Sequence, residues 1–187
     1  MTPLEIQYVD DAIASTVARF RQTPNVFLTE DDLRLHLSRD LLRHFGSEEQ
    51  TNDGDTSISL HSEVRWYGFG DLKIRSDIVL VDVASLDVRR STRMPSKGFN
   101  FNIAKAIIEL KLRRSNGPSN PEFQSGIQND LTKLRKLSGI FCEPRQPFSA
   151  QFWMVVFDKK EHLRELPRAE EGIRLIYEFS DRSEPRP

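Results

Sequence analysis

The chain has 187 residues, of which 37% are hydrophobic and 29% are charged, and its formal net charge is -1. This balance is typical of a folded globular protein, because disordered chains combine low hydrophobicity with high net charge. No apolar run approaches the roughly 20 residues that a membrane-spanning helix needs, and the N-terminus lacks a signal-peptide pattern. We therefore expect one domain over residues 1–187, a cytoplasmic location and no membrane partner. The single cysteine, Cys142, permits no intramolecular disulfide.

Apolar residues at helical spacing predict two helices near the N-terminus, over residues 4–21 and 29–45. Thr29 is a typical N-cap for the second helix, and Gly46 follows its last turn. The acidic residues of its first turn, Glu30, Asp31 and Asp32, suit the positive end of the helix dipole. That role accounts for them, and contact of one of them with a metal stays open.

Residues 47–57 form a polar loop, and residues 58–67 then alternate between apolar and polar side chains. This pattern predicts a half-buried strand with Glu63 on the polar face. Its other face carries Ile58, Leu60, Ser62, Val64 and Trp66. The turn residues 68–71 lead into a second strand over residues 73–82, which predicts a hairpin.

Charged residues interrupt two strands that are otherwise apolar. Asp77 lies within residues 73–82, whereas Glu109 and Lys111 lie within residues 104–112. Glu109 and Lys111 are two positions apart, so their side chains leave the same face of the strand. Charges in apolar strands are costly unless they pair, meet water or hold a ligand. If the two strands are neighbours, Asp77 and Glu109 can converge on one divalent cation beside the Lys111 ammonium.

The rest of the chain alternates loops with regular elements. Residues 83–101 predict a basic excursion, and residues 115–121 predict a loop rich in Gly, Pro and Ser. Apolar periodicity predicts a helix over residues 122–137. A buried strand is expected over residues 151–158, a short helix over 161–166 and a last strand over 173–179.

An acid on one strand, here Ser76-Asp77, followed by Glu-x-Lys on the next, here Glu109-Leu110-Lys111, resembles the PD-(D/E)XK nuclease superfamily. Ser76 replaces the proline of the name. The resemblance implies an α/β fold with a restriction-endonuclease-like three-layer α-β-α core over about residues 29–158. That core runs helix, three strands, helix and strand. An N-terminal helix and a C-terminal helix and strand would be additions.

The resemblance also implies residue roles. Asp77, Glu109 and Lys111 would be catalytic, with Lys111 positioning the attacking water and stabilising developing charge. Asp77, Glu109 and the Leu110 carbonyl would bind Mg²⁺, for which Mn²⁺ can substitute, and Glu63 would support the metal. Oxygen ligands of this kind suit magnesium.

Basic residues near this motif are candidates for nucleic-acid binding, because phosphate affinity depends on local Lys and Arg clusters. The candidates are Arg89, Arg90, Arg93, Lys97, Arg113 and Arg114, with Gln128 added from the resemblance. We expect phosphodiester hydrolysis, of DNA rather than RNA and by an endonuclease rather than an exonuclease, with a homodimer left open. Two alternatives stay open: a catalytically inactive member that binds nucleic acid or scaffolds a protein, and an α/β domain that binds a small molecule or protein.

Overall fold

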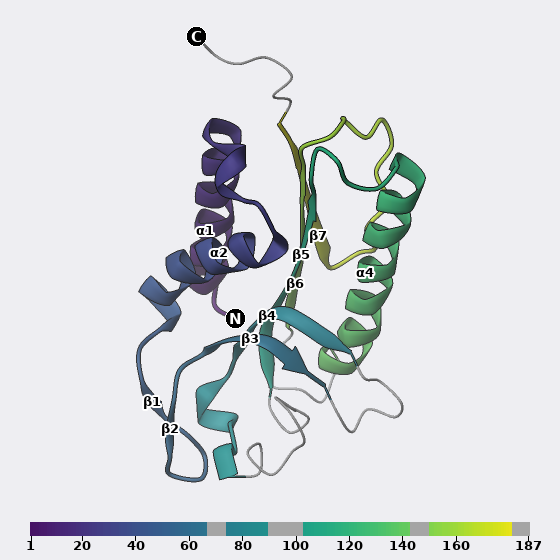
Figure 1. The fold of residues 1–187 in the computed structure, drawn as a ribbon. Coiled ribbons are helices and arrows are strands. Elements are labelled where there is room, and N and C mark those ends of the chain that lie inside the picture. The colour runs from purple at the N-terminus through teal and green to yellow at the C-terminus, as the bar shows by residue number, and fades with distance from the viewer. Residues whose placement is uncertain (67–73, 90–102, 143–149, 181–187) are drawn as a thin grey trace.

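A mixed sheet of five strands lies at the centre of the computed structural model, which describes residues 1–66, 74–89, 103–142 and 150–180 (Figure 1). The strands, in spatial order, are β3 (Leu60–Arg65), β4 (Arg75–Val81), β5 (Ala104–Arg113), β6 (Gln151–Asp158) and β7 (Ile173–Phe179). The first three pair antiparallel, and β5, β6 and β7 pair parallel. The predicted α/β class is therefore confirmed, and the strands that carry Asp77 and Glu109 are neighbours, which is the condition for these two acids to converge.

Helices cover both faces of this sheet. Figure 1 shows α1 (Pro3–Gln22) and α2 (Glu30–Phe45) on one face and α4 (Asn120–Phe141) on the other. The order of helix, three strands, helix and strand agrees with the prediction. Short 3-10 turns span Pro24–Val26 and Val83–Ser85, and a small hairpin of β1 (Glu49–Gln50) and β2 (Thr56–Ser57) occupies the predicted polar loop. Within the described ranges, no helix is long and apolar enough to cross a membrane.

Two hydrophobic cores hold these layers together. The core beneath α1 and α2 includes Leu37 and Ile108, and the core beneath α4 includes Ile107 and Leu134. Strand β5 contributes to both cores because its alternating residues point to opposite faces. This double burial explains its nearly continuous apolar sequence, and it makes each charge within the strand conspicuous.

Strand β3 departs from the predicted alternation. Leu60 packs in the core beneath α1 and α2, whereas Val64 and Trp66 pack in the core beneath α4. Even-numbered residues of a regular strand would share one face. Glu63 has a φ of 57°, in the left-handed region, and this turn of the backbone changes the buried face. The prediction that Ile58, Leu60, Ser62, Val64 and Trp66 share one face is therefore wrong.

The helix predicted over residues 161–166 is also absent from the described structure, where this segment is irregular. Its backbone groups bond to distant side chains instead of to one another. The Glu161 carbonyl accepts a hydrogen bond from Arg113, and the Leu163 N–H donates to the Tyr177 hydroxyl. These tertiary bonds replace the local bonds of a helix.

Arg113, predicted to bind nucleic acid, is instead part of the protein interior. Its side chain is 0% exposed and forms a bidentate pair with Asp158, with Nε–Oδ1 and Nη2–Oδ2 distances of 2.8 and 2.5 Å. It also donates to Asn120, and its guanidinium lies over the ring of Phe123. Because this guanidinium is buried and its nitrogens already bond within the protein, that prediction is wrong for Arg113.

We expect Arg113→Met to lower the free energy of unfolding by about 3–5 kcal/mol, because it leaves the buried Asp158 carboxylate without its partner. The exposed neighbour gives a matched control: Arg114→Met should change stability by no more than about 0.5 kcal/mol. Urea denaturation of the two variants measures the difference. Equal losses in both would contradict a structural role specific to Arg113.

Candidate active site

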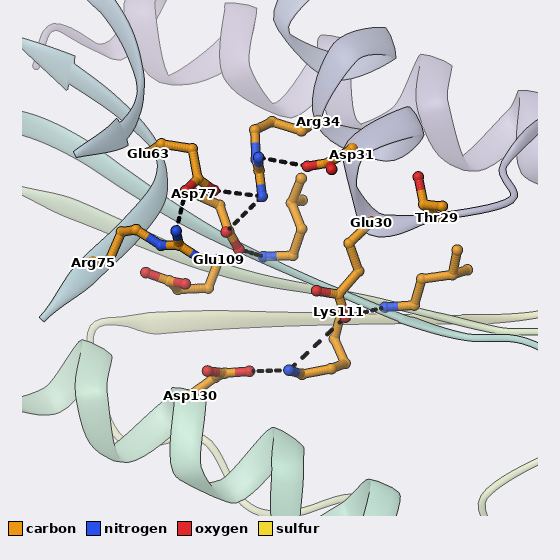
Figure 2. Close-up of polar contacts among 12 residues, drawn as sticks. Thr29, Glu30, Asp31, Arg34, Glu63, Arg75, Asp77, Glu109, Lys111 and Asp130 are labelled. Atoms are coloured by element: carbon orange, nitrogen blue, oxygen red, sulfur yellow. Dashed lines mark hydrogen bonds and ion pairs between the residues drawn. The ribbon is translucent and has the colours of Figure 1, made fainter. Parts of the chain in front are cut away.

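Three carboxylates lie at the same level of the antiparallel strands. The pairing of residue 78 with residues 62 and 108 sets Asp77 level with Glu63 on one side and with Glu109 on the other. Figure 2 shows these side chains gathered between α2 and α4. The sheet register therefore places Asp77 beside Glu109, as the sequence predicts.

Asp77 occupies the point where the ladder between β4 and β5 ends. That ladder stops at the pair formed by residues 78 and 108. One step beyond it, the Leu110 N–H donates to Asp77 Oδ2 at 2.8 Å, so a side chain takes the place of a backbone acceptor. The other oxygen, Oδ1, accepts a hydrogen bond from Arg34 Nη2 at 3.2 Å. Asp77 thus links β5 to α2.

Glu63 is held by two arginines. Its Oε1 lies 2.7 Å from Arg34 Nη2, and its Oε2 lies 2.6 Å from Arg75 Nη1. Arg34 therefore bridges Glu63 and Asp77 through one nitrogen (Figure 2). The arrangement brings the predicted supporting carboxylate into the site, but as the partner of cations from the protein itself.

Glu109 is the most deeply buried of the acids, with 1% of its surface exposed. Its Oε2 pairs with the Lys133 ammonium of α4, whereas its Oε1 is buried without a hydrogen-bond partner in the described structure. Burial raises the pKa of Glu109 well above its ordinary value, although the charge of Lys133 opposes this rise. Asp77 raises the pKa further, as expected of a nearby like charge.

Lys111 is held between acids from both helical layers. Its Nζ lies 2.8 Å from Asp130 Oδ2 on α4 and 3.9 Å from Glu30 Oε1 on α2. Burial lowers the pKa of Lys111, but the charge and hydrogen bond of Asp130 and the charges of Glu30 and Asp77 together outweigh it, and the pKa lies above its ordinary value. Lys111 is therefore an ammonium at neutral pH, suited to stabilise negative charge and not to accept a proton.

The three acidic residues in the first turn of α2 have different roles. Glu30 accepts a hydrogen bond from the Leu112 N–H at 3.2 Å, so it belongs to the site. Asp31 pairs with Arg34 at 2.7 Å, and Asp32 accepts from the backbone N–H of Thr29 as a capping residue. The predicted cap is confirmed, and one acid of the turn does reach the site.

A cavity of about 500 Å³ opens beside these groups. It is lined by Thr29, Glu30, Asp31, Arg34, Glu63 and Arg75. The lining is almost entirely charged, so this hollow suits a polar or charged ligand rather than an apolar one.

The predicted nucleic-acid contacts are only partly placed. Arg89 and Arg114 are exposed, and the Arg89 N–H donates to Asp53. Gln128 is exposed on α4 and lines a different hollow, with Glu165. Three further candidates lie outside the described residues: Arg90, Arg93 and Lys97.

Four charged residues of the site were not among the predicted candidates: Arg34, Arg75, Asp130 and Lys133. A signal exists on α4, because Asp130 and Lys133 continue from Gly126 at spacings of four and three, directly beside the apolar stripe. Gly126 lies next to the Lys111 side chain of β5, since a Cβ at Gly126 would be 3.9 Å from Lys111 Cε. A polar stripe next to an apolar one can thus face a buried charge.

The carboxylates of the site are oxygen donors of the type that magnesium prefers, but their present ion pairs would have to break for the ion to bind. The described residues contain no group of three or more His, Cys, Asp or Glu placed to hold a metal. Two carboxylates suffice when water and substrate phosphates complete the coordination. The unpartnered Glu109 Oε1 and the adjacent Asp77 supply such oxygens. Their present partners, Lys133 and Arg34, come from opposite helical layers and would have to yield.

Comparison of the chain with protein-family models, with curated proteins and with solved structures gave no match. An inference about function therefore depends on the sequence motif and the geometry of the site.

The raised pKa of Glu109 predicts a pH-dependent effect of Glu109→Gln. The folded protein holds a proton on Glu109 more tightly than the unfolded chain does, so its contribution to stability is greatest at low pH and falls as pH rises. Gln cannot titrate. The difference in free energy of unfolding, variant minus wild type, should therefore be more positive at pH 8 than at pH 5, as measured by urea denaturation.

Glu122→Gln is the control. A hydrogen bond from the Ser119 hydroxyl lowers the pKa of Glu122, so its carboxylate is ionised at both pH values. Its difference should vary little between them. If the Glu109 difference were equally flat, or more positive at pH 5, the account of a costly buried carboxylate would be wrong.

Proposed function

We propose that this chain is a metal-dependent nuclease of the restriction-endonuclease-like fold. The observation that carries the proposal is that Asp77 lies beside Glu109 at the end of the β4–β5 ladder, with Lys111 two positions further along β5 and near enough for the Asp77 charge to raise its pKa. The order of helix, three strands, helix and strand also agrees with the resemblance. The fold family and the activity both rest on this agreement of motif, order and position.

Asp77 and Glu109 would hold the metal, for which Mg²⁺ is the expected ion. A bound magnesium ion would polarise the scissile phosphate and make its bound water more acidic. The Leu110 carbonyl remains a proposed ligand, and Glu63 a supporting acid. Glu30, which lies 3.9 Å from Lys111 Nζ, joins them as an acid that orients the lysine.

Lys111 would act through its charge. Burial lowers its pKa, but the charge and hydrogen bond of Asp130 together with the charges of Glu30 and Asp77 raise it above the ordinary value, so Lys111 keeps its proton near neutral pH. The ammonium can donate hydrogen bonds to a phosphate oxygen or to the attacking water. It would also stabilise the negative charge that grows in the transition state.

A catalytically inactive module with the same fold is the second candidate, and a specific observation favours it. Glu109 pairs with Lys133, Asp77 pairs with Arg34, and Lys111 pairs with Asp130. A network in which the protein supplies its own counterions could serve to bind nucleic acid or a protein partner without a metal.

We expect the full chain to cleave supercoiled plasmid in the presence of Mg²⁺ and not in the presence of EDTA. Asp77→Asn and Lys111→Met should each lower the rate by about 100-fold or more, because the first removes a proposed metal ligand and the second removes the ammonium that stabilises developing charge. Glu171→Gln, an exposed carboxylate before β7, serves as the control and should keep the wild-type rate. Linear duplex and single-stranded RNA, assayed in parallel, test the preference for DNA and for internal cleavage.

Undiminished cleavage in both Asp77→Asn and Lys111→Met would rule out the assigned residues. Absence of cleavage by wild type, together with DNA binding that weakens as salt rises, would favour the inactive module.

A further inference from the structure

The Glu109 carboxylate needs a cation next to it. Its side chain is 1% exposed, and a buried ion without a counterion is strongly destabilising. Lys133 supplies that charge from α4 through Glu109 Oε2, while Oε1 has no partner in the described structure. The site therefore already contains a cation at the carboxylate that the proposed function assigns to a metal.

Lys133 has other partners within reach. Its Nζ donates to the Arg75 carbonyl at 3.1 Å and lies 3.5 Å from Asp130 Oδ1. Its side chain is 22% exposed, so the end of the flexible stem is not fixed by packing on every side. The ammonium could lose Glu109 and still keep a carbonyl and a carboxylate.

Asp130 contacts both Lys133 and Lys111, so a movement of Lys133 would also affect Lys111. One of its oxygens, Oδ2, holds Lys111 at 2.8 Å, and the other faces Lys133. When a second ammonium comes closer to a carboxylate, the carboxylate attracts the first ammonium less strongly. Moving Lys133 onto Asp130 would thus leave more of the Lys111 charge for a substrate phosphate.

We propose that Lys133 is a resident counterion of Glu109 that competes with the divalent cation and moves onto Asp130 when that cation binds. This inference rests on the proposed function, because it assumes that Glu109 is a metal ligand. It assigns to Lys133 a positioning role: it protects Glu109 before the metal arrives and releases Lys111 afterwards.

The test is the affinity of the full chain for Mn²⁺ alone, measured at pH 8 by isothermal titration calorimetry and by the electron paramagnetic resonance signal of free Mn²⁺. Lys133→Met removes the competitor and should tighten binding on the order of tenfold. Lys136→Met, an exposed lysine on the same helix, should bind as wild type does. Lys133→Gln tests the same expectation with a polar side chain, and circular dichroism verifies that both variants fold.

Equal or weaker Mn²⁺ binding by both Lys133 variants, with tight binding by wild type, would overturn this inference and leave the nuclease proposal standing. Absence of Mn²⁺ binding by wild type and all variants would overturn both. A gain in affinity that Lys136→Met shares would also contradict the inference, because it would reflect net charge and not the contact with Glu109.

Discussion

A carboxylate inside a sheet is the constraint on which the rest of the site depends. Glu109 is buried in β5, with one oxygen paired to Lys133 and the other without a partner in the described structure. An unsatisfied buried polar group costs about 1–3 kcal/mol, and more when it is charged. Packing of β5 against helices on both faces supplies the stability that tolerates this cost. Buried acids whose pKa is strongly shifted by burial and by nearby charges cluster at functional sites.

The charges around Glu109 are arranged in layers that follow the fold. Arg34 approaches Asp77 from α2, and Lys133 approaches Glu109 from α4. Asp130 then balances Lys111 on the α4 side. Each acid therefore has a cation from the protein, and the proposed metal would compete with Lys133 for Glu109 and with Arg34 for Asp77. Under the proposed function, the affinity for the metal would then depend on residues that need not touch the substrate.

The strand pattern was readable from the sequence because two charges interrupt apolar runs, and neighbouring strands bring such residues to one level. Less could be predicted where contacts between residues far apart in the sequence determine how a side chain is buried. The left-handed backbone of Glu63 reverses the buried face of β3, a feature that alternation alone does not reveal. In the sequence, Arg113 looks like an exposed arginine beside Arg114, yet its side chain pairs with Asp158, which is 45 positions away. Whether the polar stripe of α4 faces solvent or β5 depends on how the helix lies on the sheet.

Crystals of the full chain soaked in Mn²⁺ and measured for anomalous scattering test the central claim most directly. The account predicts one anomalous peak coordinated by both Asp77 and Glu109, with the Lys133 ammonium moved from Glu109 toward Asp130. A map without a peak at these carboxylates, in which Lys133 and Arg34 keep their ion pairs at saturating Mn²⁺, would contradict it.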